Sequence, residues 1–221
     1  MILEAIESGE ISTGRGLNQE TSLKRVGDTR WDSYYNLLLR LVDMFSHVIN
    51  MLKIIEDNGL TSEQRAEACA LLNSIQSFDF VFSLHLMKNI LGITNDLSQA
   101  LQRKDQDIIN AMALVAVCKQ RLQAMRDNGW NSLLEEVFLF CESHSIVTPN
   151  MDVMFVPQGR SRRKGAQVTN LHHFQVEIFY QVIDIQLQEL NNRFTEVNTD
   201  LLLCVACLTL ESHLSLLISK N

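Results

Sequence analysis

The chain has 221 residues, of which 46% are hydrophobic and 20% are charged, and its formal net charge is -7. Nine glycines and two prolines, Pro149 and Pro157, are too few for the closely spaced turns of a β-sandwich or a β-barrel. The apolar content excludes a disordered or collagen-like chain, so we expect one well-filled core.

The net charge and the cysteines indicate the environment of the protein. A net negative chain is not a nucleic-acid polyelectrolyte as a whole. Five cysteines, an odd number, predict no disulfide framework, and most lie among apolar neighbours as buried thiols do. The first residues lack the basic start of a secretory signal, and the apolar stretch 201–210 is too short to span a bilayer. We therefore expect a soluble intracellular protein in a reducing compartment, with no membrane partner.

Three glycines mark predicted helix ends. Gly59, Gly92 and Gly129 are each followed by an apolar residue and then by a helix-capping residue type. This order predicts a helix that ends with glycine in the left-handed conformation, followed by the start of the next helix. Capping boxes at 61–64 and 132–135 support two of these starts.

The spacing of apolar residues predicts the helices in chain order. A helix over 33–57 is apolar around much of its circumference, so we expect it to be central in a multi-helix bundle. Further helices are predicted over 62–74, 78–91, 95–101, 105–127 and 133–144. The predicted fold class is therefore all-α.

Residues 145–169 break this pattern with both prolines, two glycines and a cluster of cations, which predicts a long loop. A long helix follows over 170–194, with two predicted apolar faces. One contains Val176, Tyr180, Ile183, Leu187, Leu190 and Phe194, and the other contains Phe174, Ile178, Val182 and Ile185. The last apolar segment, 201–210, is predicted to be either a helix or a short buried strand.

Few residues have the spacing of a chemical site. Cys204 and Cys207 have redox or zinc spacing, but a zinc site needs four ligands and no second pair occurs. Cys141 and His144 fall short in the same way. We interpret these cysteines as buried helix residues, and the histidine pair at 172–173 as a polar helix start.

Arg30 and Trp31 stand just ahead of the predicted 33–57 helix, and two interpretations are open. In the first, the tryptophan packs against the helix start, with Asp32 or Ser33 as the cap. In the second, the planar indole beside a guanidinium stacks on an extruded base and holds a phosphate.

The cation cluster in the predicted loop consists of Arg160, Arg162, Arg163 and Lys164. One interpretation is a solvated loop or a nuclear import signal. The other is a phosphate-binding segment, whose affinity for DNA would fall steeply with salt.

Glu189 continues the predicted apolar face that contains Phe174 and Ile185. A carboxylate there either marks the solvated end of the face or is placed to bind a cation or metal ion. Glu196 falls one heptad later on the same face.

Four sequence blocks carry a resemblance to a known family: GRGLNQE at 14–20, GDTRWDS at 27–33, LGITNDLSQALQRKD at 91–105 and LQELNNRF at 187–194. Over about residues 10–208 the chain resembles plant transposase-derived proteins of the hAT superfamily. In these proteins an N-terminal TTF-type zinc finger precedes the matching part, and many are described as MYM-type zinc-finger-like. So many short blocks in the same order make the resemblance specific.

The resemblance implies a domain organisation. We expect a polar leader over 1–27, the helical insertion domain of an RNase-H-like transposase over 28–148, and the basic loop over 149–169. The long helix and the post-insertion segment then cover 170–208, followed by a divergent tail over 209–221. The catalytic sheet of the family, with both catalytic Asp residues, falls before the part that this chain matches.

The resemblance also implies roles for particular residues. Arg30 and Trp31 match the motif whose tryptophan is linked to a flipped base near the transposon end. Glu189, or alternatively Glu196, matches the catalytic Glu, which in intact members joins two Asp residues in binding two Mg²⁺ ions. With one carboxylate, we expect a truncated, catalytically inactive protein without a cofactor or small-molecule substrate.

Two functions follow as hypotheses. The first is a nuclear, transposase-like module that binds DNA weakly through Arg30, Trp31 and the cation cluster. The second is an all-α protein-interaction scaffold with no nucleic-acid role. In either case, apolar helix faces left exposed on 170–194 are expected to favour self-association or binding to an intact relative.

Overall fold

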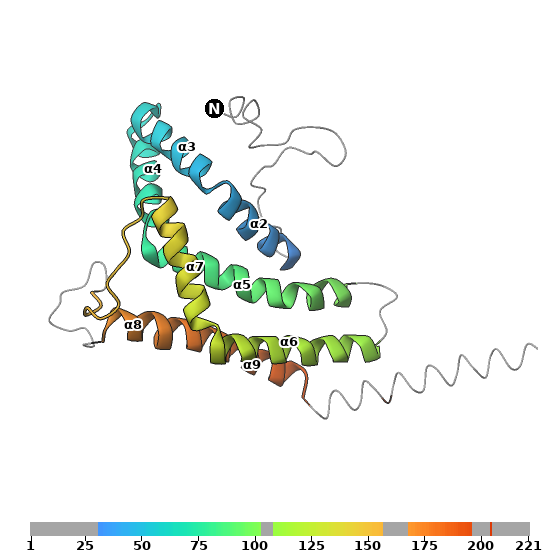
Figure 1. The fold of residues 1–221 in the computed structure, drawn as a ribbon. Helices are drawn as coiled ribbons and strands as arrows, with labels where there is room; N and C mark the ends of the chain where they lie inside the picture. The colour runs from blue at the N-terminus through green and yellow to red at the C-terminus, as the bar shows by residue number, and fades with distance from the viewer. Residues whose placement is uncertain (1–30, 103–107, 157–167, 196–203, 205–221) are drawn as a thin grey trace, which may run out of the picture. The chain divides into compact units, whose positions relative to one another are not determined.

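The computed structural model describes residues 31–102, 108–156, 168–195 and 204. Within these ranges every regular element is a helix, apart from one isolated bridge between Met154 and Thr169, so the predicted all-α class is confirmed (Figure 1). The chain divides into two compact units, Met1–Ile75 and Gln76–Asn221. Among the described helices, none combines the length and the apolar character that a membrane span requires.

The first unit contains α2 (Trp31–Asp43), α3 (Phe45–Asn58) and α4 (Ser62–Ile75). The single helix predicted over 33–57 is therefore wrong, because Met44 interrupts it and the first turn already begins at Trp31. Hydrogen bonds of 2.9 Å from Met44 N to Arg40 O and 3.0 Å from Val48 N to Met44 O continue across the interruption. The hydrogen-bonded turn thus continues through Met44 rather than opening into a loop there.

The turn between α3 and α4 has the predicted cap but a different backbone. The Thr61 hydroxyl accepts a hydrogen bond of 3.2 Å from the Gln64 N–H, as an N-cap does. Gly59, however, is extended (φ -60°, ψ 139°), so the predicted left-handed conformation is wrong. Glycine is needed for another reason: a Cβ atom there would lie 2.5 Å from the Ile55 carbonyl oxygen.

The second unit starts with α5 (Phe78–Leu101), which is capped by Ser77 through a 3.2 Å hydrogen bond from the Phe80 N–H. The break predicted at Gly92 is wrong, because α5 runs through it. Thr94 is not an N-cap, since its hydroxyl donates to the carbonyls of Ile90 and Leu91, as threonines inside helices do.

The next two helices are α6 (Ile108–Asn128) and α7 (Trp130–Ser143). Gly129 between them is right-handed (φ -84°, ψ -10°), so the left-handed prediction is wrong here too. The predicted capping box at 132–135 also fails, because α7 has already begun. The Ser132 hydroxyl donates to the Gly129 carbonyl at 3.0 Å instead.

The predicted 170–194 helix is present as a continuous helical run, but its winding changes. Thr169 caps α8 (Asn170–His172), and an eight-residue π-helix, η2 (His173–Tyr180), leads into α9 (Gln181–Arg193). Within the second unit α6 lies alongside both α5 and α9 (Figure 1).

The π-helix changes which residues reach the core. The i→i+5 hydrogen bonds of a π-helix place residues five apart on the same face. Phe174 and Phe179, which are five apart, are both buried, and Ile183 continues their face. Phe179 lies on neither of the two apolar faces predicted from an α-helical period, while Val176 and Ile185 from those faces are exposed.

Aromatic rings from α5, α7 and η2 form the centre of the second unit, which we call the aromatic cluster. Its members are Phe78, Phe82, Trp130, Phe174 and Phe179. Ring centroids lie 4.9 Å apart for Phe78–Phe174, 5.1 Å for Phe82–Phe174 and 5.5 Å for Trp130–Phe179. These separations are within the range of favourable aromatic pairs.

The π winding can be tested with two substitutions in η2. Phe179→Ala removes a fully buried ring and should lower the free energy of unfolding by about 3–5 kcal/mol. Val176→Ala, on a face that an α-helical period would bury, should lower it by less than about 1 kcal/mol. Urea unfolding followed by circular dichroism measures both. A larger loss for Val176→Ala would contradict the π winding.

Candidate functional site

The structure locates only part of the residues predicted as functional. Arg30, Glu196 and the cation cluster at 160–164 lie outside the described residues. Trp31 forms the first residue of α2, so it lies within the helix rather than ahead of it. Glu189 lies on α9.

Glu189 is part of a surface ion pair. Its side chain is 54% exposed, and its Oε2 atom lies 3.5 Å from Nε of Arg193, one turn later on α9. This is the solvated end of the helix face, as the first interpretation of Glu189 holds. In the part of the chain that the structure describes, no three His, Cys, Asp or Glu side chains converge as metal ligands would.

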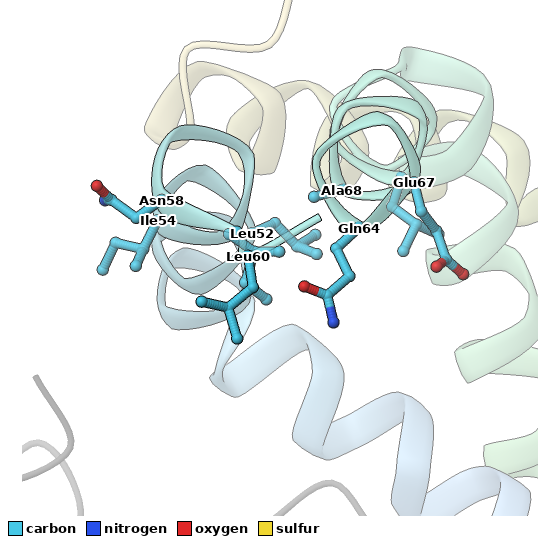
Figure 2. Close-up of a pocket in the computed structure, with 10 residues that line it drawn as sticks. Leu52, Ile54, Asn58, Leu60, Gln64, Glu67 and Ala68 are labelled. Carbon is cyan, nitrogen blue, oxygen red and sulfur yellow. The ribbon is translucent and has the colours of Figure 1, made fainter. Parts of the chain in front are cut away.

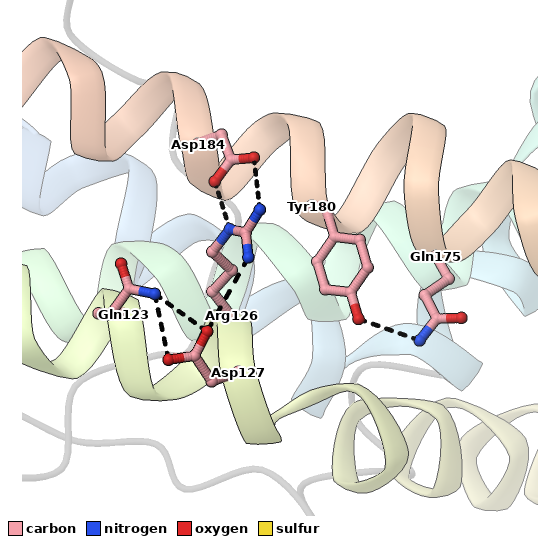
Figure 3. A network of polar contacts seen from close by, with 6 residues as sticks. All are labelled: Gln123, Arg126, Asp127, Gln175, Tyr180 and Asp184. Carbon is pink, nitrogen blue, oxygen red and sulfur yellow. Dashed lines mark hydrogen bonds and ion pairs between the residues drawn. The ribbon is translucent and has the colours of Figure 1, made fainter.

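A polar network joins α6 to η2 and α9 (Figure 3). Arg126 donates to both carboxylate oxygens of Asp184, with 3.1 Å between Nη2 and Oδ2. Its guanidinium lies 5.1 Å from the centre of the Tyr180 ring, whose hydroxyl accepts from Gln175 at 3.2 Å. Hydrogen bonding to Arg126 lowers the pKa of Asp184, so the pair stays ionised at neutral pH. Nearby, Lys119 of α6 donates to a carbonyl at the end of α9.

A second polar group, which we call the His85 cluster, lies between α5 and α7. Lys88 donates to Oε1 of Glu136, and Asn89 donates to Oε2 at 3.2 Å. The His85 ring is only 2% exposed, and its Nδ1 atom lies 3.1 Å from Oε1 of Glu136. That approach is too poorly aligned for a hydrogen bond, and neither ring nitrogen has an aligned partner among the described residues. The ring edge packs against Phe140 at a centroid distance of 4.8 Å.

The environment keeps His85 neutral and Glu136 ionised. Burial, together with the Lys88 ammonium, lowers the pKa of His85 below its ordinary value, although the Glu136 carboxylate acts in the opposite sense. Burial alone would raise the pKa of Glu136, but hydrogen bonds from Lys88 and Asn89 outweigh it and lower that pKa. Because the imidazole is almost fully buried, we interpret this cluster as a contribution to stability.

Cys207 lies outside the described residues, and Cys204 is exposed, so the prediction that it is buried is wrong. The other predicted pairs do not form sites within the described residues. Cys141 is fully buried, and burial raises the pKa of its thiol to about 11, which leaves it unreactive at neutral pH. The His144 ring contacts the Phe140 carbonyl at 2.9 Å. His173 pairs with Glu177 at 2.7 Å and stacks on a phenylalanine ring, as a polar helix start can.

A surface groove lies in the first unit, between α3 and α4 (Figure 2). Its volume is about 420 Å³. Most of the residues that line it are apolar, and they come from the end of α3, the turn and the start of α4: Leu52, Ile54, Ile55, Asn58, Gly59, Leu60, Gln64, Glu67, Ala68 and Leu71. Sequence periodicity did not predict this groove, because it arises where two helices diverge from a tight turn.

The described helices are acidic, and most of their cations are engaged. Acidic side chains outnumber basic ones in these ranges. Most of the basic side chains contact acceptors within the protein: Arg65, Lys88, Lys119, Arg121, Arg126 and Arg193. The densest positive charge in the sequence is the cluster at 160–164, outside the described ranges.

Comparison with known proteins gives a partial match. No family model matches the chain, and no solved structure gives a significant match. The chain is 22% identical over 194 residues to the "52 kDa repressor of the inhibitor of the protein kinase" of Mus musculus. The Homo sapiens protein of the same name is 22% identical over 198 residues. Each match covers 83% of this chain, which spans about a quarter of the length of these curated relatives.

The His85 cluster predicts that acid destabilises the second unit. Because the pKa of His85 is lower in the folded state than its ordinary value of 6.5, its contribution is fully present above 6.5 and is lost as the pH falls. His85→Leu should therefore lose less stability than the parent between about pH 7.5 and 5.5. Urea midpoints at both pH values measure this, with the exposed His172→Gln as the control. Equal pH dependence of parent and His85→Leu would contradict it.

Proposed function

We propose that this chain is a transposase-like helical module that contacts DNA through Arg30, Trp31 and the cation cluster at 160–164. The resemblance of its sequence blocks to hAT-type proteins supports this proposal. So does the match to a protein whose name describes it as a repressor, over 83% of this chain. A nuclear location follows from the same resemblance.

One observation carries the proposal: the described helices have little positive charge to offer to a phosphate. Most of their cations are already engaged, for example Arg126 by Asp184, Lys88 by Glu136 and Arg121 by Asp96. Moving such a cation to DNA would break an ion pair and leave its acid facing the phosphates. The electrostatic part of DNA binding, which dominates its affinity, therefore falls to the cation cluster.

We also propose that these residues do not cut or join DNA strands by themselves. Two-metal strand transfer needs several carboxylates around two divalent ions about 4 Å apart. Glu189, the described carboxylate that the resemblance links to catalysis, is more than half exposed and pairs with Arg193. The Arg193 guanidinium beside it offsets part of the negative charge that a metal ion would need.

The proposal is tested by the salt dependence of DNA binding. Each cation removed from a phosphate should reduce the slope of log affinity against log salt by about 0.9 on duplex DNA. Replacing Arg160, Arg162 and Arg163 by Ala should therefore reduce the slope by about 3 and weaken binding at low salt. Fluorescence anisotropy of a labelled duplex, measured across a NaCl series with the full chain, gives both quantities.

The matched control removes the same number of cations from the described helices. Lys53, Arg121 and Arg193 are exposed, so replacing them by Ala should preserve the fold and the salt slope. Equal reductions of the salt slope and of the DNA affinity in the two triple variants would mean that binding follows net charge alone. That result, or no binding by the parent, would favour the protein-interaction scaffold instead.

A further inference from the structure

The groove between α3 and α4 exposes apolar side chains that a folded chain normally covers. Leu60, in the turn, is 94% exposed, while Ile54 of α3 and Leu71 of α4 are each 45% exposed. Figure 2 shows Leu60 at the mouth of the groove and Ala68 deeper between the helices. Met51, one turn before Ile54 on α3, is 49% exposed and extends the apolar surface along the helix. Contiguous exposed apolar surface of this kind marks sites of protein association.

The rim of this groove is acidic. Glu67 lines it, and Glu63 lies one turn earlier on α4. Asp57 lies one turn after Ile54 on α3. The Arg65 guanidinium donates to the Gly59 carbonyl at 2.7 Å and to Ser62, so its charge lies beside the groove and offsets part of this negative charge, but the acids outnumber it. A partner with positive charge beside its apolar side chains is complementary to this surface.

We propose that the groove binds an amphipathic helix of a partner protein, with its apolar side chains in the groove and its Lys or Arg residues facing the acidic rim. Helices bind in this way when a few anchor side chains at i, i+3 or i+4 and i+7 enter an apolar groove. A volume of about 420 Å³ holds a small number of such anchors. The inference goes beyond DNA contact and does not rest on it, because the groove residues and the cation cluster are separate parts of the sequence.

The charge of the rim selects this occupant over others. A DNA backbone would be repelled by Glu63 and Glu67, and an acidic helix would meet like charges. A basic amphipathic helix gains both from the attraction of its cations to the rim and from burial of its apolar side chains. The rim charges steer association, and the buried side chains set the affinity.

The test uses two synthetic helical peptides of about four turns with identical leucine positions. One carries lysine at all other positions, and the other carries glutamate. Fluorescence anisotropy with the full chain should show at least about tenfold tighter binding of the leucine–lysine peptide. Comparable binding of the leucine–glutamate peptide would overturn the role of the acidic rim, and no binding of either would overturn the proposal.

Paired variants locate the bound peptide. The groove variant Leu60→Ser with Leu71→Ser removes two exposed apolar side chains of the groove without altering charge. It should weaken binding of the leucine–lysine peptide by at least about tenfold. The control variant Val117→Ser with Leu139→Ser removes apolar side chains of 41% and 61% exposure from α6 and α7. It should change the affinity by less than about twofold. Equal losses in both variants would show nonspecific adhesion and overturn the proposal.

Two further measurements separate this proposal from loss of the fold and from DNA binding. Leu60→Ser alone alters a side chain that is almost fully exposed, so its urea unfolding should match that of the parent while peptide binding weakens. An unchanged affinity in this stable variant would count against the groove. The groove variant should keep the DNA affinity and salt slope of the parent, so failure of one proposal leaves the other testable.

Discussion

The second unit depends on the packing of its aromatic cluster. Phe78 and Phe82 come from α5, Trp130 from the first turn of α7, and Phe174 and Phe179 from η2, so the rings join segments far apart in the sequence. Burying each large side chain is worth roughly 1.5–3 kcal/mol, which exceeds the cost of a few suboptimal helical hydrogen bonds. The π winding of His173–Tyr180 follows from this balance, because it brings two phenylalanines five residues apart onto one buried face.

The dominance of tertiary packing over local backbone preference also explains how much of the fold could be predicted from the sequence. The positions of most helices follow from apolar spacing, and the Thr61 cap follows from local chemistry. Gly92 has the same neighbours in type as Gly59, an apolar residue and then a threonine, yet only Gly59 lies between helices. Around Gly92, the buried Ile90 and Leu97 keep the chain in one helix, and tertiary packing of this kind is invisible to a local pattern.

The candidate sites were predictable only where charged residues are close neighbours in the sequence. The cluster at 160–164 is evident from composition, whereas the His85 cluster joins residues of α5 to Glu136, about 50 positions later. The α3–α4 groove is equally hidden, since its lining residues come from two helices and the turn between them, and the apolar spacing of each helix does not show how the two pack together. Glu189 illustrates the converse: its place on an apolar stripe suggests a site, whereas the structure shows an exposed carboxylate paired with Arg193 one turn away.

The distribution of charge connects the two proposed interactions. A helical body that pairs its own cations retains an excess of carboxylates, and these repel phosphates while attracting basic side chains. Under the two proposals, this charge pattern directs nucleic acid to the sequence segment that concentrates arginine and lysine, and it leaves the acidic groove to a partner of opposite charge. Raising the salt concentration weakens both interactions, but unequally. Phosphate binding through counterion release weakens in proportion to the number of phosphates neutralised, whereas anchors buried in an apolar groove retain most of their affinity. We therefore expect the two proposed interactions to respond differently to ionic strength even though one charge pattern underlies both.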